Sequence, residues 1–179
     1  MELLIGCGSS RDKKLHREGR SEWTALTTLD IAPQHNPDVV WDLNDLSLPF
    51  EDDTFDEIHA YEVLEHCGRQ GDYKFFFNQW SDFWRILKPG GVFFGTVPYF
   101  KSVWALGDPS HTRIIQRENF TFLVQPQYDD QVGKTPMSDF RHIYKADFDI
   151  VHLQDAFLAP GAEFLEFGLQ AVKPSRCSL

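Results

Sequence analysis

The sequence predicts an α/β fold built on one open, mostly parallel sheet, and three observations support this. Residues 2–5 form a short apolar run that ends in the small-residue loop Gly6-Cys7-Gly8, as a buried strand turning into a loop does. Residues 72–87 carry apolar side chains at helical spacing. Near the end of the chain, two β-rich runs flank Pro160-Gly161, which is typical of an antiparallel hairpin.

The other elements follow from composition and turn signals. The helix at 72–87 presents an aromatic stripe that we assign to the core, and Lys88-Pro89-Gly90-Gly91 is predicted to end it with a left-handed glycine cap. Residues 98–146 are aromatic-rich and lack a clear period, which favours a lid or substrate insertion within a single domain of residues 1–179. Strands are expected at 2–5, 23–30, 39–41, 55–61, 92–97, 148–153 and 164–172.

The first crossover departs from the usual strand–helix–strand unit. Residues 9–22 are almost wholly polar, and Leu15 is their only large aliphatic residue. A helix here would have no apolar face to pack on the sheet. We therefore expect an irregular or very short helix, which leaves a sheet face for another segment or for a second subunit, so a homodimer is plausible.

Composition limits the functions that the chain can have. Its 179 residues, 42% of them hydrophobic, suffice for one substantial core. The formal charge of −10 argues against binding to nucleic acid or to an anionic membrane, because such binding needs clustered Lys and Arg. No apolar run approaches the length of a membrane span. The 3 cysteines are odd in number and lack metal-type spacing, which indicates thiols in a reducing compartment and a cytoplasmic protein.

Small or polar residues follow four predicted strands, at Gly6 to Gly8, Asp30, Asp42 and Tyr61-Glu62. In an open α/β sheet, ligands bind outside the carboxyl ends of the strands, where the strand order reverses. Asp30 lies about 20 residues beyond Gly8, the separation at which an acid can accept hydrogen bonds from ribose hydroxyls.

An adenine ring would fit beside that ribose. Asp42 is placed to accept a hydrogen bond from the exocyclic amine of adenine, while the backbone of Leu43 meets the ring edge. The apolar side chains of Ile31 and Leu43 would then sandwich the ring. These residues together predict an adenosine-binding site.

A dinucleotide cofactor, as in a nicotinamide-dependent oxidoreductase, is the alternative occupant. Its pyrophosphate fingerprint needs a third glycine, where this chain has Arg11, and a helix that directs its amino terminus at the phosphates. The predicted irregular crossover lacks that helix. The site therefore suits adenosine with a short tail better than two phosphates.

Together these residues resemble class I S-adenosylmethionine-dependent methyltransferases, and most closely small proteins of the methyltransferase type 11 group. The resemblance covers roughly residues 2–97. It implies a Rossmann-like, seven-stranded, mostly parallel sheet with the last strand antiparallel, and S-adenosylmethionine as the cofactor. It rests on the motifs Leu4-Ile5-Gly6-Cys7-Gly8-Ser9-Ser10, Leu29-Asp30-Ile31, Asp42-Leu43-Asn44, Leu48-Pro49-Phe50-Glu51-Asp52-Asp53-Thr54-Phe55-Asp56, Val63-Leu64-Glu65-His66 and Leu87-Lys88-Pro89-Gly90-Gly91.

The resemblance also implies roles for single residues. The Gly6-Cys7-Gly8 backbone would lie against the methionine portion, and main chain near Ala60 and Tyr61 would receive the methionine amino group. Asp30 would hold the ribose, and Asp42 with Leu43 would hold adenine. Two departures bear on affinity, because Leu4 stands where an acid is frequent and Ser10 replaces the usual third glycine.

Methyl transfer to a small-molecule, sugar or protein acceptor needs mainly in-line positioning of the nucleophile. If the acceptor is a hydroxyl, a base helps, and the candidates are His66, His111, Tyr99 and Glu62. His66 is better suited to a capping hydrogen bond than to catalysis, and His111 is equally suited to a structural role. No metal-ligand cluster is evident. The alternative function is a catalytically degenerate cofactor-binding scaffold or interaction protein.

Overall fold

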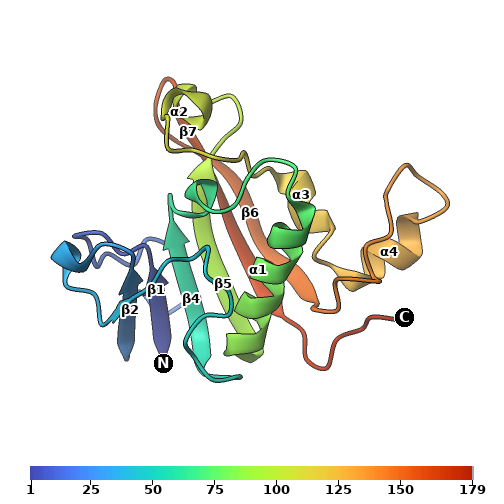
Figure 1. The fold of residues 1–179 in the computed structure, drawn as a ribbon, viewed down its shortest axis with the longest axis horizontal. Coiled ribbons are helices and arrows are strands. Elements are labelled where there is room, and N and C mark those ends of the chain that lie inside the picture. Colours follow the sequence, from blue (N-terminus) through green and yellow to red (C-terminus); the bar gives the residue numbers. More distant parts are fainter. Residues whose placement is uncertain (179) are drawn as a thin grey trace.

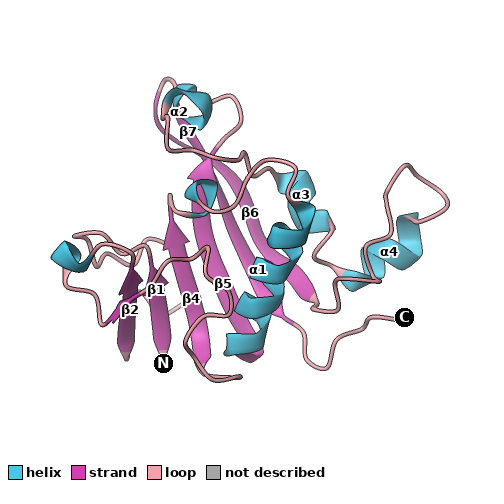
Figure 2. Ribbon diagram, in the orientation of Figure 1, coloured by secondary structure: helices cyan, strands magenta, loops and turns pink. Residues whose placement is uncertain are grey.

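The computed structural model describes residues 1–178 and contains one seven-stranded sheet with the strand order β3-β2-β1-β4-β5-β7-β6 (Figures 1 and 2). Leu179, the last residue of the predicted domain, lies outside the described residues. The strands are β1 (Glu2–Ile5), β2 (Leu26–Asp30), β3 (Val39–Val40), β4 (Phe55–Tyr61), β5 (Leu87–Pro98), β6 (Phe148–Ala159) and β7 (Ala162–Ala171).

The pairing confirms the predicted fold class. Strands β1 to β5 pair in parallel, whereas β7 runs antiparallel to both β5 and β6. The two last strands form the predicted hairpin, with its turn at Pro160-Gly161. The strand order reverses at β1, which pairs with β2 on one side and with β4 on the other. The carboxyl ends of these strands are therefore the expected binding crevice.

The main helix, α1, covers one face of the sheet in front of β5 (Figure 1). Its amino-terminal cap is Asp72, whose carboxylate accepts a hydrogen bond from the N–H of Phe75 (3.0 Å). The described helices are the 3-10 helices η1 (Pro33–His35) and η2 (Leu64–His66), and the α-helices α1 (Tyr73–Ile86), α2 (Val103–Gly107), α3 (Arg117–Thr121) and α4 (Gln125–Gln131).

The predicted glycine cap of this helix is wrong. Leu87 already has an extended backbone and pairs with Phe55, so residues 88–91 belong to β5. Gly90 (φ 74°) instead lies where the register between β4 and β5 shifts. The residue before a proline favours extended backbone, and pairing with β4 stabilises that conformation at Lys88.

Aromatic side chains fill the space between α1 and the sheet. Trp80 is fully buried, and its ring lies 5.1 Å from that of Phe93 on β5 and 6.1 Å from that of Phe167 on β7. Phe120 of α3 packs on the same Phe167 ring at 4.5 Å. The second part of the predicted insertion at 98–146 thus contributes to the core.

The first part of that insertion has another position. Helix α2 lies beyond the carboxyl end of β5 and the amino-terminal end of β7, next to the turn of the hairpin (Figure 1). The hydroxyl of Ser102 donates a hydrogen bond to the carbonyl oxygen of Gly161 (3.0 Å), which ties α2 to that turn. Opening and closing of this part as a lid remains a prediction.

The first crossover is irregular, as expected. Lys13, only 2% exposed in its side chain, forms ion pairs with Glu2 (3.1 Å) and Glu57 (2.9 Å) on the sheet face opposite α1. The backbone N–H groups of Lys14 and Leu15 both donate to the hydroxyl of Tyr61 (3.1 Å each). This loop covers the face itself, which removes the reason given above for a homodimer.

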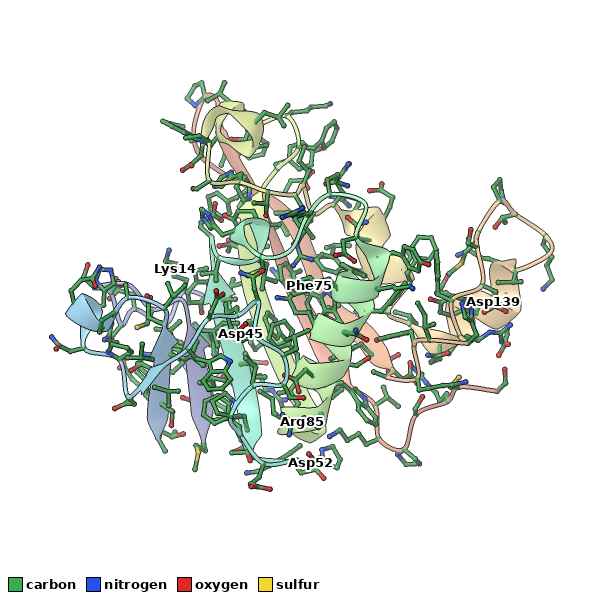
Figure 3. The ribbon with its side chains drawn as sticks, viewed as in Figure 1. Lys14, Asp45, Asp52, Phe75, Arg85 and Asp139 are labelled. Carbon is green, nitrogen blue, oxygen red and sulfur yellow. The ribbon has the colours of Figure 1, made fainter. Side chains whose placement is uncertain are left out.

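The two ends of the sheet differ in their side chains. Figure 3 shows Arg85 and Asp52 together at the amino-terminal end of β4, and their side chains form an ion pair (2.9 Å). Lys14 lies nearer the opposite end, where the cavities described below open. Among residues 1–178, no helix has the length and apolar character needed to cross a membrane.

Candidate functional site

A cavity of about 270 Å³ lies at the carboxyl ends of β1, β2 and β4. The structure brings seven of the predicted site residues into its wall, although they come from four separate segments of the chain. These residues are Gly6, Asp30, Ile31, Asp42, Leu43, Glu62 and His66. Trp41 and Val63 complete much of the remaining wall.

The carboxylate of Asp30 is held in place by the backbone around it. One oxygen accepts the N–H of Gly8 and the other accepts the N–H of Ala32, both at 2.8 Å. A carboxylate has about four lone-pair sites, so each oxygen can accept one more hydrogen bond. Asp30 is thus a fixed and nearly buried acceptor on the cavity wall, suited to hydroxyl donors.

The glycine loop has the left-handed backbone that the sequence suggested. Gly6 (φ 57°) lies so close to the side chain of Val63 that a β-carbon there would clash with it. The N–H of Cys7 donates to Leu29 (3.3 Å), and that of Gly8 donates to Asp30. Because these two donors are already used, the loop is poorly equipped to bind a pyrophosphate.

The side of the cavity that was predicted to hold adenine is formed after β3. One oxygen of Asp42 accepts both the backbone and the side-chain N–H of Asn44 (2.9 Å each). The side-chain oxygen of Asn44 in turn accepts the N–H of Gly68 (2.8 Å), which links this segment to the chain after η2. Ile31 is largely exposed beside the cavity, whereas Leu43 is buried.

Three predicted cofactor residues do not contribute to the described cavity wall. Cys7 and Gly8 shape the turn behind it, and burial raises the pKa of the Cys7 thiol. The hydroxyl of Tyr61 forms hydrogen bonds with Nδ1 of His59 (2.8 Å) and with the backbone of the first crossover. Burial raises the pKa of Tyr61 to about 12. A contact from the main chain near Tyr61 to a bound ligand stays a prediction.

A second cavity, of about 540 Å³, adjoins the first and shares Glu62 and His66 with it. Its wall includes His111, and Trp104 from α2 lies at its edge with 57% of its surface exposed. Tyr99 is not among the described residues of this wall, because its N–H pairs with the carbonyl of Glu163 and its ring packs on Phe100.

Sequence reasoning missed Glu65. It is 2% exposed, and burial together with the negative charge of Glu62 raises its pKa to about 8. The pKa of Glu62 is also raised by burial. The signal that could have revealed Glu65 is the pair of acids three residues apart, which places both carboxyls around the single turn of η2.

The structure also brings together residues that the sequence gave no reason to combine. One candidate ligand atom each of Glu65, His66 and His111 lies within 4.8 Å of the others, a grouping that was not evident in the sequence. The carbonyl oxygen of Glu65 accepts the N–H of Thr112 (2.9 Å), and this bond holds His111 against η2. Long sequence separation concealed the cluster.

A family model described as a methyltransferase domain matches residues 3–95. The chain belongs to this methyltransferase domain family. The match runs from β1 into β5 and includes every residue of the first cavity named above. It confirms the class I methyltransferase resemblance seen in the sequence. No curated protein sequence matches the chain.

Solved methyltransferase structures share the fold. A chain in the complex of the Haloferax volcanii methyltransferase activator Trm112 with a methyltransferase has a TM-score of 0.58 and 16% identity, over 96% of this chain and 82% of that one. The N-methyltransferase NodS of Bradyrhizobium japonicum, in complex with S-adenosylhomocysteine, has a TM-score of 0.56 and 14% identity, over 95% and 76%. An S-adenosylmethionine-dependent methyltransferase of Archaeoglobus fulgidus has a TM-score of 0.57 and 14% identity, over 94% and 85%.

Proposed function

We propose that this protein is an S-adenosylmethionine-dependent methyltransferase that transfers the sulfonium methyl group to an acceptor by in-line displacement. The observation that carries the proposal is the first cavity, where Gly6, Asp30 and Asp42 meet within the stretch matched by the methyltransferase domain family. S-adenosylmethionine is the cofactor that this family and the complex of NodS with S-adenosylhomocysteine support.

The contacts around the cavity suggest how the cofactor is held. Asp30, with one further acceptor site on each oxygen, binds the ribose hydroxyls. Asp42 accepts the exocyclic amine of adenine, and the side chains of Ile31 and Leu43 cover the ring. The backbone of Gly6 lies along the methionine portion, while Cys7 and Gly8 maintain the turn that fixes Asp30.

The second cavity is the proposed acceptor site. Its volume of about 540 Å³ falls in the range of ligand-binding pockets, which suits a small molecule, a sugar or an inserted protein side chain. Since Glu62 and His66 border both cavities, the methyl group is expected near them. Positioning of the two reactants can lower the barrier by about 7–11 kcal/mol, so little further catalysis is required.

A hydroxyl acceptor would also need to lose a proton. His66 and His111 border the second cavity and are the better-placed candidates for the base. Tyr99 lies outside the described wall, which weakens the prediction that it acts as a base.

Calorimetric titration with S-adenosylmethionine, S-adenosylhomocysteine and NAD tests the cofactor site. We expect the first two to bind, and Asp30→Ala to weaken binding by about tenfold to a hundredfold, as expected for the loss of a charge-assisted hydrogen bond worth about 1.5–3 kcal/mol. Asp45→Asn, which alters an exposed acid in the same part of the chain, is the matched control.

The remaining outcomes separate the alternatives. Binding of NAD alone would favour an oxidoreductase and contradict the proposal. Failure of a folded protein to bind any of the three compounds would favour the degenerate scaffold. Protein partners and a homodimer stay predictions, and the activator complex of the Haloferax volcanii protein is a reason to test for the former. A cytoplasmic location likewise stays a prediction.

A further inference from the structure

We infer that Glu65, His66 and His111 form a binding site for one divalent first-row transition-metal ion in the wall of the proposed acceptor cavity. The first observation is their convergence. One potential ligand atom from each residue lies within 4.8 Å of the other two. Ligand atoms about 2.1 Å from a tetrahedral zinc ion lie about 3.4 Å apart, so small side-chain rotations would close the site around an ion.

The second observation is independent of that spacing. Glu65 is almost completely buried, yet neither of its carboxylate oxygens has a hydrogen-bond partner among residues 1–178. Nδ1 of His111 is also buried without such a partner. Buried polar atoms are nearly always paired, and an unpaired carboxylate is particularly costly. Nε2 of His111 lies 3.9 Å from one oxygen of Glu65, too far for a hydrogen bond, and a cation bound between them would satisfy both groups.

The histidine rings are already oriented for this role. Nδ1 of His66 lies 3.3 Å from the carbonyl oxygen of Ser110, so an Nδ1–H group donates a hydrogen bond to that oxygen and leaves the lone pair of the neutral ring on Nε2. Such a hydrogen bond is the usual support for a metal-binding histidine. The rings of His66 and His111 meet edge to face, 4.7 Å apart. Backbone bonds from Thr112 and Arg113 to Glu65 fix the position of the second ring.

The donor set selects the class of metal. Two imidazoles and one carboxylate suit zinc and its first-row neighbours, whereas magnesium and calcium prefer oxygen ligands throughout. Three protein ligands leave at least one coordination position open. Because all three residues border the second cavity, the open position faces the proposed acceptor.

The position of the metal site also indicates which class of acceptor is methylated, an inference that rests on the proposed function. A hydroxyl oxygen that binds the metal ion becomes more acidic and loses its proton to solvent. The oxygen then forms a bond to the methyl carbon while the carbon–sulfur bond breaks, and that electron pair stays on sulfur to give S-adenosylhomocysteine. The inferred acceptor is therefore an alcohol or phenol and not an amine.

Metal binding can be measured without cofactor or acceptor. Chelator-treated protein is dialysed against Zn²⁺ or Co²⁺, and we expect one ion per chain and a visible Co²⁺ spectrum with nitrogen and oxygen ligands. Glu65→Gln, which keeps the shape of the side chain, and His111→Ala should each weaken binding at least tenfold. His142→Ala, at an exposed histidine outside both described cavities, is the control and should bind like the wild type.

The outcomes test metal binding and the catalytic role of the metal separately. Folded wild-type protein that binds no Zn²⁺ or Co²⁺, or affinity unchanged in both Glu65→Gln and His111→Ala, would overturn the site. Metal binding without S-adenosylmethionine binding would support the site and refute the proposed function. Full activity of metal-free protein on a hydroxyl acceptor would overturn the catalytic role, whereas activity lost on chelation and restored by Zn²⁺ would support it.

Discussion

The two faces of the sheet are closed in opposite ways. On one face, α1 and α3 pack aromatic rings around Trp80. On the other, the irregular crossover of residues 9–22 has no helix and binds the sheet through Lys13, which contacts the carboxylates of Glu2 and Glu57. One face is apolar and the other depends on directed polar contacts.

The difference teaches what each face contributes. Apolar burial is strong and non-directional, so the α1 face supplies most of the stability. A buried ion pair adds little net stability compared with apolar residues of similar size, but it fixes geometry. The crossover follows Gly6 to Gly8 directly, so its polar anchors hold the chain that leaves the first cavity, the proposed cofactor site.

Replacing Trp80, the central ring of the aromatic cluster, should strongly destabilise the packing on the apolar face. Trp80→Ala is expected to cost about 4–5 kcal/mol, because it leaves a large cavity among rigid aromatic rings. Urea unfolding followed by circular dichroism measures this loss. Trp104→Ala, at an exposed tryptophan, should change the free energy of unfolding by less than about 0.5 kcal/mol. Equal losses in both variants would contradict the assignment of the core to this face.

Replacing Lys13, the buried cation, should loosen the crossover on the polar face, with a smaller loss of stability than at Trp80. Lys13→Met keeps the aliphatic chain but removes the cation that contacts both Glu2 and Glu57, and leaves Glu57 the longer contact with Arg17 (3.7 Å), at a cost of about 3 kcal/mol. Lys14→Met changes an exposed neighbour and should be nearly neutral. Limited proteolysis should find new cleavage within residues 9–22 in the first variant. An undisturbed crossover would show that other contacts hold it.

The polar face should also determine acid stability. Burial tends to raise the pKa of Glu57, but hydrogen bonds with His59 and Lys13 and the charge of Lys13 lower it to about 2, from a usual value of 4.5. The carboxylate therefore stabilises the fold above about pH 4.5, and this contribution disappears as the pH falls toward 2. The pKa of His59 is lowered, chiefly by burial, so its protonation in the unfolded chain acts in the same direction.

Glu57→Gln has the smallest expected effect on stability, but it tests the polar face most specifically. The amide keeps part of the hydrogen bonding, so the loss at pH 7 should be about 1–2 kcal/mol. Its stability should fall less steeply than that of the wild type between pH 4.5 and 2. Urea midpoints measured at several pH values provide the comparison. Parallel curves for the two proteins would assign the acid sensitivity to other groups.

Local patterns sufficed for the strands and for α1, because apolar spacing and turn residues act over short stretches. They also singled out Asp30, the last residue of β2, and Asp42, two residues beyond β3, and both line the first cavity. They failed at Lys88 to Gly91, where pairing with β4 overrode the expected helix cap. They also failed to group Glu65 with His111, since tertiary hydrogen bonds from Thr112 and Arg113 bring these residues together.

The two cavities draw on different stretches of the chain. Residues 6 to 67 form the first, whereas the second adds residues from 96 to 111 and from 162 to 166. Under the proposed function, the architecture is modular. A lineage with this fold can diversify its acceptors through changes in the later stretches while it inherits cofactor binding unaltered. A mutant library restricted to those stretches would sample new substrates on a constant cofactor site.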